Sequence, residues 1–573
     1  MNDNRNLILA IVLSAIVLIG WSFFFPTSGP ETTVVEDAEV EAVAVPEADP
    51  GPDAPAELRE LGTVLAEGDR VAIETPHLAG SLNLTGARID DLVLTQHSQD
   101  MREDSPPVRL FTPSGVENSY FAQFGWAGEG IETPGTDAVW TANGDTLTPE
   151  TPVTLSWSNE TGQTFEMEVS VDEGYLFTID QRIVNRGDGA IGVTPYSLAS
   201  RGFGEIESSF WTIHLGPIGV FNNEADYDID WDALDEAGNA GVNRATTDGW
   251  VGFTDKYWLA ALIPGRGQSA EATLRKGRAA GTYQAQLVGD AKLVNPGTQL
   301  TTTTRLFAGA KEKEWFNVYE DEYGVQRLSK AIDWGWFEWF MRPIFALLLL
   351  LYKWIGNFGV AIIALTFIVR FFLFPLANKQ FRSMAGMRRI QPKLKALQER
   401  YKDDKPRLQQ EMLKLYQTEK INPAAGCLPI LLQIPIFYAL YKVLMVSVEM
   451  RHQPFFGWLQ DLSAPDPLTP VNLFGLLDFT PPSFLLIGIL PILLGITMWL
   501  QFKLNPAPMD ETQKTIFGIM PWVLMVIMAP FAAGLQLYWV TSNILTMAQQ
   551  KWLYHKYDVE HAGDTVIEAK AKK

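Results

Sequence analysis

The chain has 573 residues, and its 67 acidic and 45 basic side chains give a formal net charge of −22. This length exceeds one ordinary domain, and the acidity disfavours direct binding of nucleic acid, which requires clustered Lys and Arg. The single cysteine, Cys427, excludes an intrachain disulfide, and the six histidines form no close pair typical of a zinc site. Glycine-rich phosphate and dinucleotide loops are also absent from the sequence. We therefore expect neither a metal nor a cofactor.

The amino-terminal segment is predicted to anchor the chain in a membrane. Residues 7–25 are uncharged and form a run long enough to cross the hydrocarbon core as a helix. No small-residue cleavage site follows, so we interpret residues 1–26 as a retained transmembrane anchor. Residues 27–60 are rich in Pro, Ala, Asp and Glu, and this composition predicts an acidic disordered linker.

Residues 61–310 alternate between apolar and polar positions, with turn signals between the runs, and predict an all-β domain. Phe165, Met167, Val169 and Val171 share one face of a strand that turns at 172–174, as in a β-hairpin. Repetition of this pattern predicts a large antiparallel sandwich. His214 and the acidic residues of 226–236 could form a sugar or metal site. We favour the interpretation that His214 lies at the edge of the core and that residues 226–236 form a solvated loop.

Residues 311–351 are predicted to connect the sandwich to a membrane part through a polar helix and an interfacial helix. The interfacial helix, at 337–351, mixes aromatic residues with Glu338, Arg342 and Pro343, and a full membrane span is the alternative.

Residues 352–556 contain long apolar runs and predict a helical membrane core. We expect spans at about 357–376, 426–448, 483–502, 516–530 and 531–550, which make six with the amino-terminal anchor. The basic segment 377–424, which includes Arg388, Arg389, Lys393 and Lys395, is predicted to be a cytoplasmic helical hairpin by the positive-inside rule. Contact with lipid headgroups would also explain its charge. The topology then places both termini, including the short tail 557–573, in the cytoplasm and the sandwich on the outer side.

The predicted spans hold no Asp or Glu, which argues against a proton- or sodium-coupled carrier. Two fixed charges remain. Lys442 lies close enough to the outer end of its span to snorkel to the interface, and Arg370 could snorkel as well. Alternatively, Arg370 faces a hydrated recess lined by uncharged polar residues of the other spans, where it would attract the acidic flank of a hydrophobic segment entering the bilayer.

Three strings in this core resemble a known family: LTFIVRFFLFPLANKQFRSMAGMRRIQPKLKALQERYKDD, INPAAGCLPILLQIPIFYALYKVL and GLQLYWVTSNILTMAQQ. They are similar to the YidC branch of the YidC/Oxa/Alb membrane protein insertases, and the resemblance covers about residues 333–556. The anchor and the large β-rich region resemble the Gram-negative form of the family, whose periplasmic domain is a β-supersandwich similar to sugar-mutarotase folds.

The resemblance implies a multi-domain protein of the bacterial inner membrane that inserts and chaperones newly made membrane proteins, without being an enzyme. By motif position, Arg370 corresponds to the arginine of the family's hydrophilic groove. Thr366 lies one helical turn from Arg370 on the same face, and Gln433, Tyr538 and Ser542 fall in the family's groove-forming helices. Residues 377–424 resemble the family's cytoplasmic region, which is needed for insertion. The implied partners are nascent membrane proteins, the Sec translocon and lipids, with the ribosome or the signal-recognition-particle receptor as further candidates.

An alternative class is a membrane-tethered periplasmic carbohydrate-binding or epimerase-like protein. In that case the sandwich would carry the function and the spans would only anchor it. Against this interpretation, an anchor does not require a charged and polar bundle of five helices.

Overall fold

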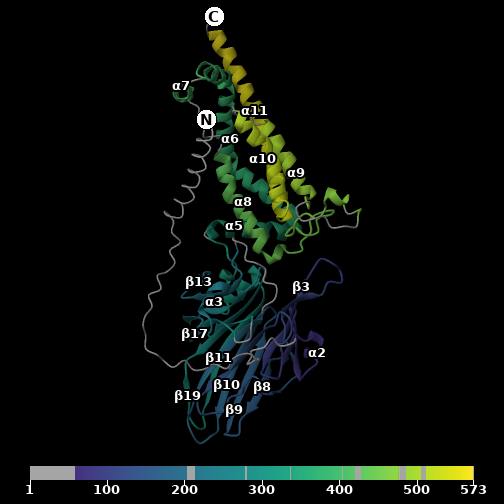
Figure 1. Ribbon diagram of the computed structural model, residues 1–573, viewed down its shortest axis with the longest axis vertical. Helices are drawn as coiled ribbons and strands as arrows, with labels where there is room; N and C mark the ends of the chain where they lie inside the picture. The colour runs from purple at the N-terminus through teal and green to yellow at the C-terminus, as the bar shows by residue number, and fades with distance from the viewer. Residues whose placement is uncertain are drawn as a thin grey trace. The chain divides into compact units, whose positions relative to one another are not determined.

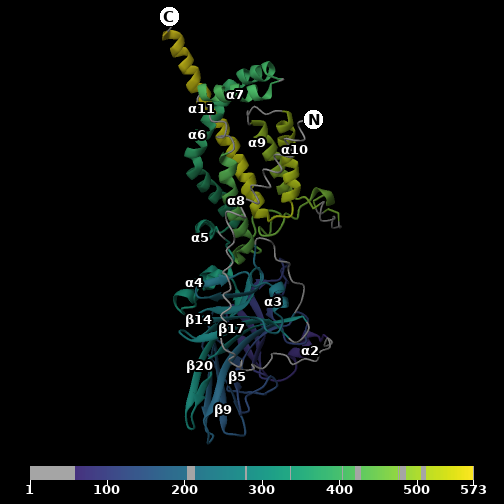
Figure 2. The same ribbon diagram turned by 60° about the vertical axis from the view of Figure 1, so that its left-hand side comes forward.

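The computed structural model describes residues 58–202, 213–277, 281–335, 337–402, 404–419, 428–474, 476–477, 486–504 and 511–571. The predicted anchor at 1–26 and nearly all of the predicted linker at 27–60 lie outside these residues. The described chain contains a β-rich part up to Ala310 and a helical part after it (Figures 1 and 2).

The β-rich part begins with a short helix, α2 (Leu61–Leu65), and contains two sheets. The eleven strands of the first sheet are β1 (Arg70–Glu74), β2 (Leu78–Asn83), β3 (Arg88–Ser98), β4 (Pro107–Phe111), β5 (Tyr120–Gly128), β7 (Thr146–Leu147), β11 (Ile191–Gly202), β14 (Val242–Thr247), β17 (Ser269–Lys276), β18 (Thr282–Gly289) and β19 (Lys292–Val294). Their order is β14-β17-β18-β11-β5-β3-β2-β1-β7, with β19 beside β11 and β4 beside β3.

The nine strands of the second sheet are β6 (Thr141–Ala142), β8 (Val153–Ser158), β9 (Gln163–Val171), β10 (Leu176–Asn185), β12 (Gly216–Phe221), β13 (Glu224–Asp226), β15 (Trp250–Thr254), β16 (Trp258–Pro264) and β20 (Gln299–Ala310). Their order is β13-β12-β15-β16-β20-β10-β9-β8-β6, and a short helix, α3 (Trp231–Ala237), follows β13 in the chain.

The predicted hairpin is confirmed by β9 and β10, which pair antiparallel with Val171 opposite Phe177. Phe165, Met167, Val169 and Val171 are all buried, because alternate residues of a strand point to the same face. The ring of Phe165 lies 5.2 Å from that of Trp126 on β5, which belongs to the other sheet. Apolar side chains of the two sheets therefore meet in a shared core, as expected for a sandwich.

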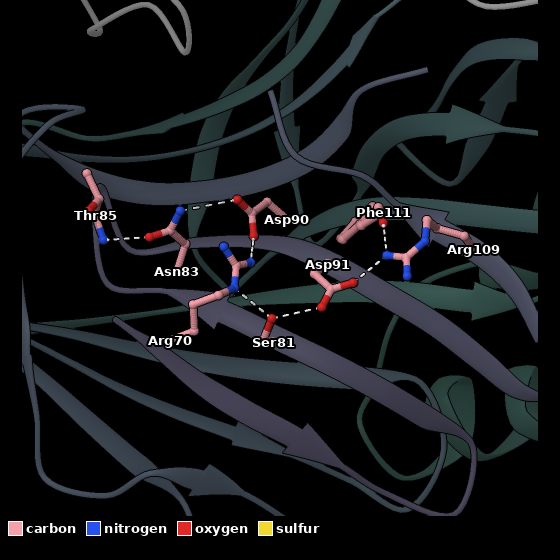
Figure 3. A network of polar contacts seen from close by, with 8 residues as sticks. All are labelled: Arg70, Ser81, Asn83, Thr85, Asp90, Asp91, Arg109 and Phe111. Carbon is pink, nitrogen blue, oxygen red and sulfur yellow. Dashed lines mark hydrogen bonds and ion pairs between the residues drawn. The ribbon is translucent and has the colours of Figure 1, made fainter. Parts of the chain in front are cut away.

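A buried polar network joins the first four strands of the first sheet (Figure 3). Arg70 forms an ion pair with Asp90 and donates from Nε to Ser81 Oγ at 2.7 Å, and Ser81 Oγ donates to Asp91 Oδ2 at 2.8 Å. Arg109 pairs with Asp91. Burial raises the pKa of Asp90, although Arg70 opposes this effect. Each arginine is thus paired with an aspartate, as buried charges require, although Arg70 Nη1 has no hydrogen-bond partner within the described residues.

The connection to the helical part consists of α4 (Lys313–Asp321), a 3₁₀ turn at Leu328–Ala331 and α5 (Glu338–Ile355). Helix α5 matches the predicted interfacial helix in position. It buries Met341, Phe345 and Leu348, which recur at helical spacing, while Trp339 and Trp354 are largely exposed.

The remaining helices are α6 (Phe358–Arg400), α7 (Lys405–Thr418), α8 (Leu428–Val446), α9 (Ile489–Leu504), α10 (Glu511–Met528) and α11 (Ala533–Ala571). Helix α11 contacts α6, α8 and α9, and α6 also contacts α5. By length and composition, residues Phe358–Asn378 of α6 form a segment capable of crossing a membrane. Shorter apolar segments occur at Gln433–Val446, Ile489–Leu504 and Thr515–Met528.

The basic hairpin is formed by the second half of α6 and by α7. Helix α6 does not end at the predicted membrane boundary near residue 376 but continues to Arg400. Helix α7 begins at Lys405, and Asp404 caps it by accepting a hydrogen bond from the Arg407 backbone N–H at 3.2 Å. Pro406 lies in the first turn of α7, where a missing N–H costs little.

Candidate functional site

The predicted groove residues come from three neighbouring helices. Thr366 and Arg370 lie one turn apart on α6, Gln433 lies on α8, and Tyr538 and Ser542 lie one turn apart on α11. Because residues four apart share a helix face, α6 and α11 each present two polar side chains on one side.

Two direct polar contacts connect these helices. Arg370 Nη2 donates to the Ser542 carbonyl oxygen at 3.2 Å and also contacts Ser542 Oγ. Gln433 Nε2 donates to the Tyr538 hydroxyl at 2.6 Å. Arg370 and Gln433 are half-buried, whereas Tyr538 and Ser542 are buried. Four of the five sequence-predicted residues are thus brought together, because Arg370 on α6 and Gln433 on α8 each contact a residue of α11.

Thr366 belongs to this cluster by position but not by contact. Its hydroxyl donates to the Ile362 carbonyl of the same helix at 2.7 Å, and the side chain is buried. This i−4 bond satisfies the hydroxyl without a partner on another helix.

Arg370 carries the only fixed charge of the cluster. Its guanidinium contacts the oxygens of Ser542 on α11, and no ion pair to Arg370 occurs within the described part of the chain. Neutral oxygens satisfy some of the five guanidinium N–H groups but do not neutralise the charge. The half-buried arginine can therefore attract an additional anionic group.

Other uncharged polar residues of the predicted spans form hydrogen bonds within the bundle. Gln536 Nε2 donates to the carbonyls of Met528 and Phe531 at 2.8 and 2.9 Å, which closes the turn between α10 and α11. Asn543 Nδ2 donates to Thr497 Oγ1 of α9 at 3.1 Å. These contacts match ordinary interhelical hydrogen bonding.

The snorkelling expected of Lys442 is wrong. Its side chain is fully buried, and Nζ donates to the Asp333 carbonyl at 2.7 Å and to Asp333 Oδ2 at 3.1 Å. Asp333 also accepts hydrogen bonds from the backbone N–H groups of Gly335 and His214. Sequence reasoning did not identify Asp333 as a partner. The only sequence signal was its place in an Asp-Trp-Gly-Trp string before α5.

The predicted hairpin residues are all on α6. Lys393 Nζ lies 2.6 Å from Glu419 Oε1, beyond the end of α7, and Lys395 is exposed. Arg388 and Arg389 belong to the helix, but their side chains lie outside the described features.

The residues of the alternative sugar or metal site in the sandwich make contacts with neighbouring parts of the sandwich. His214 Nε2 lies 2.7 Å from the Pro217 carbonyl, and burial lowers the pKa of His214. Asp230 caps α3, and Asp226 pairs with Arg244. Within the described ranges, no group of three or more His, Cys, Asp or Glu side chains could hold a metal ion.

The fold and this cluster together define a class: a helical membrane protein with a basic hairpin, a half-buried arginine and a large β-sandwich domain. Residues 350–560 match the family profile described as "60Kd inner membrane protein", and residues 70–347 match the "YidC periplasmic domain". The membrane protein insertase YidC of Zymomonas mobilis is 44% identical over 559 residues, which cover 97% of this chain and 96% of that protein. The YidC of Dinoroseobacter shibae is 43% identical, with coverage of 100% and 99%. This chain belongs to the YidC family of membrane protein insertases.

Similar solved structures include a crystal structure of an active YidC insertase with its first transmembrane domain resolved, which is 19% identical with a TM-score of 0.37 and covers 94% of this chain and 98% of that one. A galactose mutarotase related enzyme from Lactobacillus acidophilus is 11% identical with a TM-score of 0.28, and it covers 42% of this chain and 97% of its own.

Proposed function

We propose that this chain helps hydrophobic segments of newly made proteins to enter the bacterial inner membrane. The proposal rests on the environment of Arg370. This half-buried cation lies in an apolar part of α6, and its guanidinium contacts only neutral oxygens within the described residues. A charged side chain at membrane depth costs about 2.5–3.5 kcal/mol on insertion scales. A charged residue at such a position therefore marks a functional site. Full-length similarity to insertases supports the same conclusion.

In this proposal, Arg370, Thr366, Gln433, Tyr538 and Ser542 line a hydrophilic groove between α6, α8 and α11. The polar flank of an entering segment stays solvated there while its apolar face meets lipid, and Arg370 attracts acidic residues of that flank. The process requires no bond to be made or broken, so we assign no catalytic residue.

The proposed topology has six spans: the amino-terminal anchor and five spans in α6, α8, α9, α10 and α11. Both termini lie in the cytoplasm, and the sandwich lies in the periplasm. The basic residues Arg388, Arg389, Lys393 and Lys395 of the hairpin support a cytoplasmic position by the positive-inside rule.

The proposed partners are nascent membrane proteins and membrane lipids. We also propose the Sec translocon, because the family resemblance implies it, and the ribosome or the signal-recognition-particle receptor as cytoplasmic partners of the hairpin. The short tail after residue 556 carries charges of both signs, so the hairpin is the better candidate for such contacts.

The proposal is tested by replacing Arg370 in cells depleted of their own insertase. A client with a short acidic amino-terminal tail should insert with the wild-type chain but roughly tenfold less with Arg370→Ala, since interactions of charged hydrogen-bonded groups are worth about 1.5–3 kcal/mol. Arg370→Lys should retain part of the activity. Protease protection of the client tail measures insertion.

Two controls separate groove function from folding. Each variant must accumulate in the membrane at the wild-type level, and the same client with a neutral tail should depend much less on Arg370. Equal insertion of both clients by Arg370→Ala would show that Arg370 does not act on the client charge.

A further inference from the structure

The loop between α8 and α9 carries an unusual group of exposed apolar side chains. Within seven residues, Val471, Leu473, Phe474, Leu476 and Leu477 are all exposed, and Leu476 is 83% exposed. We call these five residues the apolar tip. No charged residue occurs between Asp466 and Asp478. By contrast, the exposed large apolar residues of the described sandwich strands and loops, such as Met101, Val139 and Leu293, are isolated from one another. A contiguous exposed apolar patch marks an interaction surface.

The apolar tip has a defined local conformation. A 3₁₀ turn at Pro470–Asn472 begins the segment, and Thr469 accepts from the Val471 N–H. Leu473 and Phe474 follow in left-handed backbone conformations, with φ of 50° and 61°. Such conformations are uncommon for large side chains. The backbone N–H groups of Phe474 and Leu477 donate to the carbonyls of Thr469 and Asn472 at 3.0 and 3.1 Å, so hydrogen bonds hold this strained turn.

The base of the loop is fixed to the starts of α9 and α11, which lie at the outer end of the bundle in the proposed topology, on which this inference rests. Asp466 is buried, and its Oδ2 accepts from the Leu490 N–H at the start of α9 at 2.7 Å. Its Oδ1 accepts from Trp458 Nε1 at 3.0 Å. At the start of α11, the N–H groups of Ala533 and Gly534 donate to the carbonyls of Ala464 and Leu462.

A third attachment involves α6. Asn357, which caps that helix, donates from Nδ2 to the Phe455 carbonyl at 3.1 Å. The loop is therefore held at the level where three apolar helices begin, and in Figures 1 and 2 it projects sideways from the helices.

We infer that the apolar tip inserts into the outer leaflet of the bilayer. Its base is attached to the starts of apolar helices, so its side chains lie at the height of the outer membrane interface rather than above it. Exposed leucine and phenylalanine side chains without nearby charge match lipid and would be unfavourable in water. The inserted tip holds the outer ends of α9 and α11 at a constant depth through Asp466, Leu462 and Ala464.

The test places a probe on the tip of the full-length protein. Leu476→Cys, in a Cys427→Ser background, is labelled with an environment-sensitive fluorophore and reconstituted into phosphatidylcholine and phosphatidylglycerol vesicles. Some of the phosphatidylcholine carries a nitroxide at a shallow acyl-chain position. We expect the nitroxide lipid to quench this probe at least several-fold more effectively than it quenches the same probe at Leu293→Cys.

Leu293 is a matched control because it is also a strongly exposed leucine, at 69%, but lies on β19 of the sandwich. Aqueous iodide should quench the Leu293 probe and leave the Leu476 probe largely protected. Equal iodide quenching at the two sites would overturn the inference. A Leu476 probe shielded from both iodide and nitroxide lipid would also overturn it, since this result would indicate a protein partner or a second copy of the chain.

Discussion

Lys442 and Lys311 are buried and Arg370 is half-buried, and each of these three basic side chains has a different set of partners. Arg370 contacts the oxygens of Ser542, and Lys442 pairs with Asp333. Lys311, at the end of the sandwich, is buried with its Nζ 3.1 Å from Thr254 Oγ1 and 3.3 Å from the Ala331 carbonyl. Burial lowers the pKa of Lys311 to about 7, although Asp255 and Asp333 oppose the shift.

The lowered pKa of Lys311 predicts that stability depends on pH. In the unfolded chain the lysine keeps a pKa of about 10.4, so between pH 7 and about 10 the unfolded state binds more protons than the folded state. The Lys311 contribution to the unfolding free energy should therefore rise with pH over this window and stay constant below it. Thermal unfolding of the purified protein from pH 6 to pH 9.5 measures this effect.

Lys311→Met should remove this part of the pH dependence and should stabilise the protein most at pH 6. Lys292→Met on β19 serves as the control, because residue 292 remains partly exposed and its replacement should leave the pH profile unchanged. An unaltered profile in Lys311→Met would mean that Lys311 is not the titrating group.

At the scale of elements, α8 is held at its carboxyl-terminal end by buried polar contacts. Lys442 binds Asp333, and Glu449, just after the helix, accepts from Ser447 Oγ at 2.8 Å and from the Lys313 N–H at 3.1 Å. Burial raises the pKa of Glu449. Gln433, which donates to the Tyr538 hydroxyl, lies on the same helix.

Replacing one partner of the Lys442–Asp333 pair should destabilise the protein strongly. Asp333→Asn leaves a buried ammonium without a carboxylate, and breaking a buried pair in this way costs about 3–5 kcal/mol. The double variant Lys442→Met with Asp333→Asn should recover much of that loss, because no uncompensated charge remains. Unfolding of the four proteins in detergent gives the coupling energy, and purely additive effects would refute the pairing.

At the scale of the whole molecule, the sandwich and the loop after α8 meet through backbone carbonyl groups. Arg451 donates to the carbonyls of Ser98 and Gln99 at 2.7 and 2.9 Å, and its guanidinium lies over the rings of Tyr257 and Trp258. One side chain thus combines two hydrogen bonds with cation–π contacts.

Arg451→Ala should loosen both sides of this contact. We expect faster hydrogen–deuterium exchange in residues 95–100 and 448–462, by roughly tenfold for a loss of about 1.4 kcal/mol. Arg102→Ala is a suitable control. This exposed arginine follows β3, the strand that ends at Ser98, but it forms an ion pair only with nearby Asp100. Unchanged exchange in both segments of Arg451→Ala would show that the contact contributes nothing to stability.

The local chemistry of the sequence predicted much of the fold. Strand periodicity indicated the β9–β10 hairpin, because alternation at Phe165 and Met167 is a property of neighbouring residues. Apolar runs indicated where the helices of the predicted spans begin, but α6 and α11 continue well past the ends of those spans. The motif resemblance selected Arg370, Gln433, Tyr538 and Ser542, and three helices bring these side chains together.

Contacts between residues far apart in the chain were decided only by the tertiary structure. Arg370 and Ser542 are 172 residues apart, and Lys442 and Asp333 are 109 apart. Hydropathy gives the extent of an apolar segment but not which face of the helix meets its neighbour, so Lys442 was expected to reach the interface when it is in fact buried. The sequence by itself determined the elements and their charges, because these depend on local pattern. The partners of each buried charge were determined by helix packing, because burial without a partner is too costly to persist.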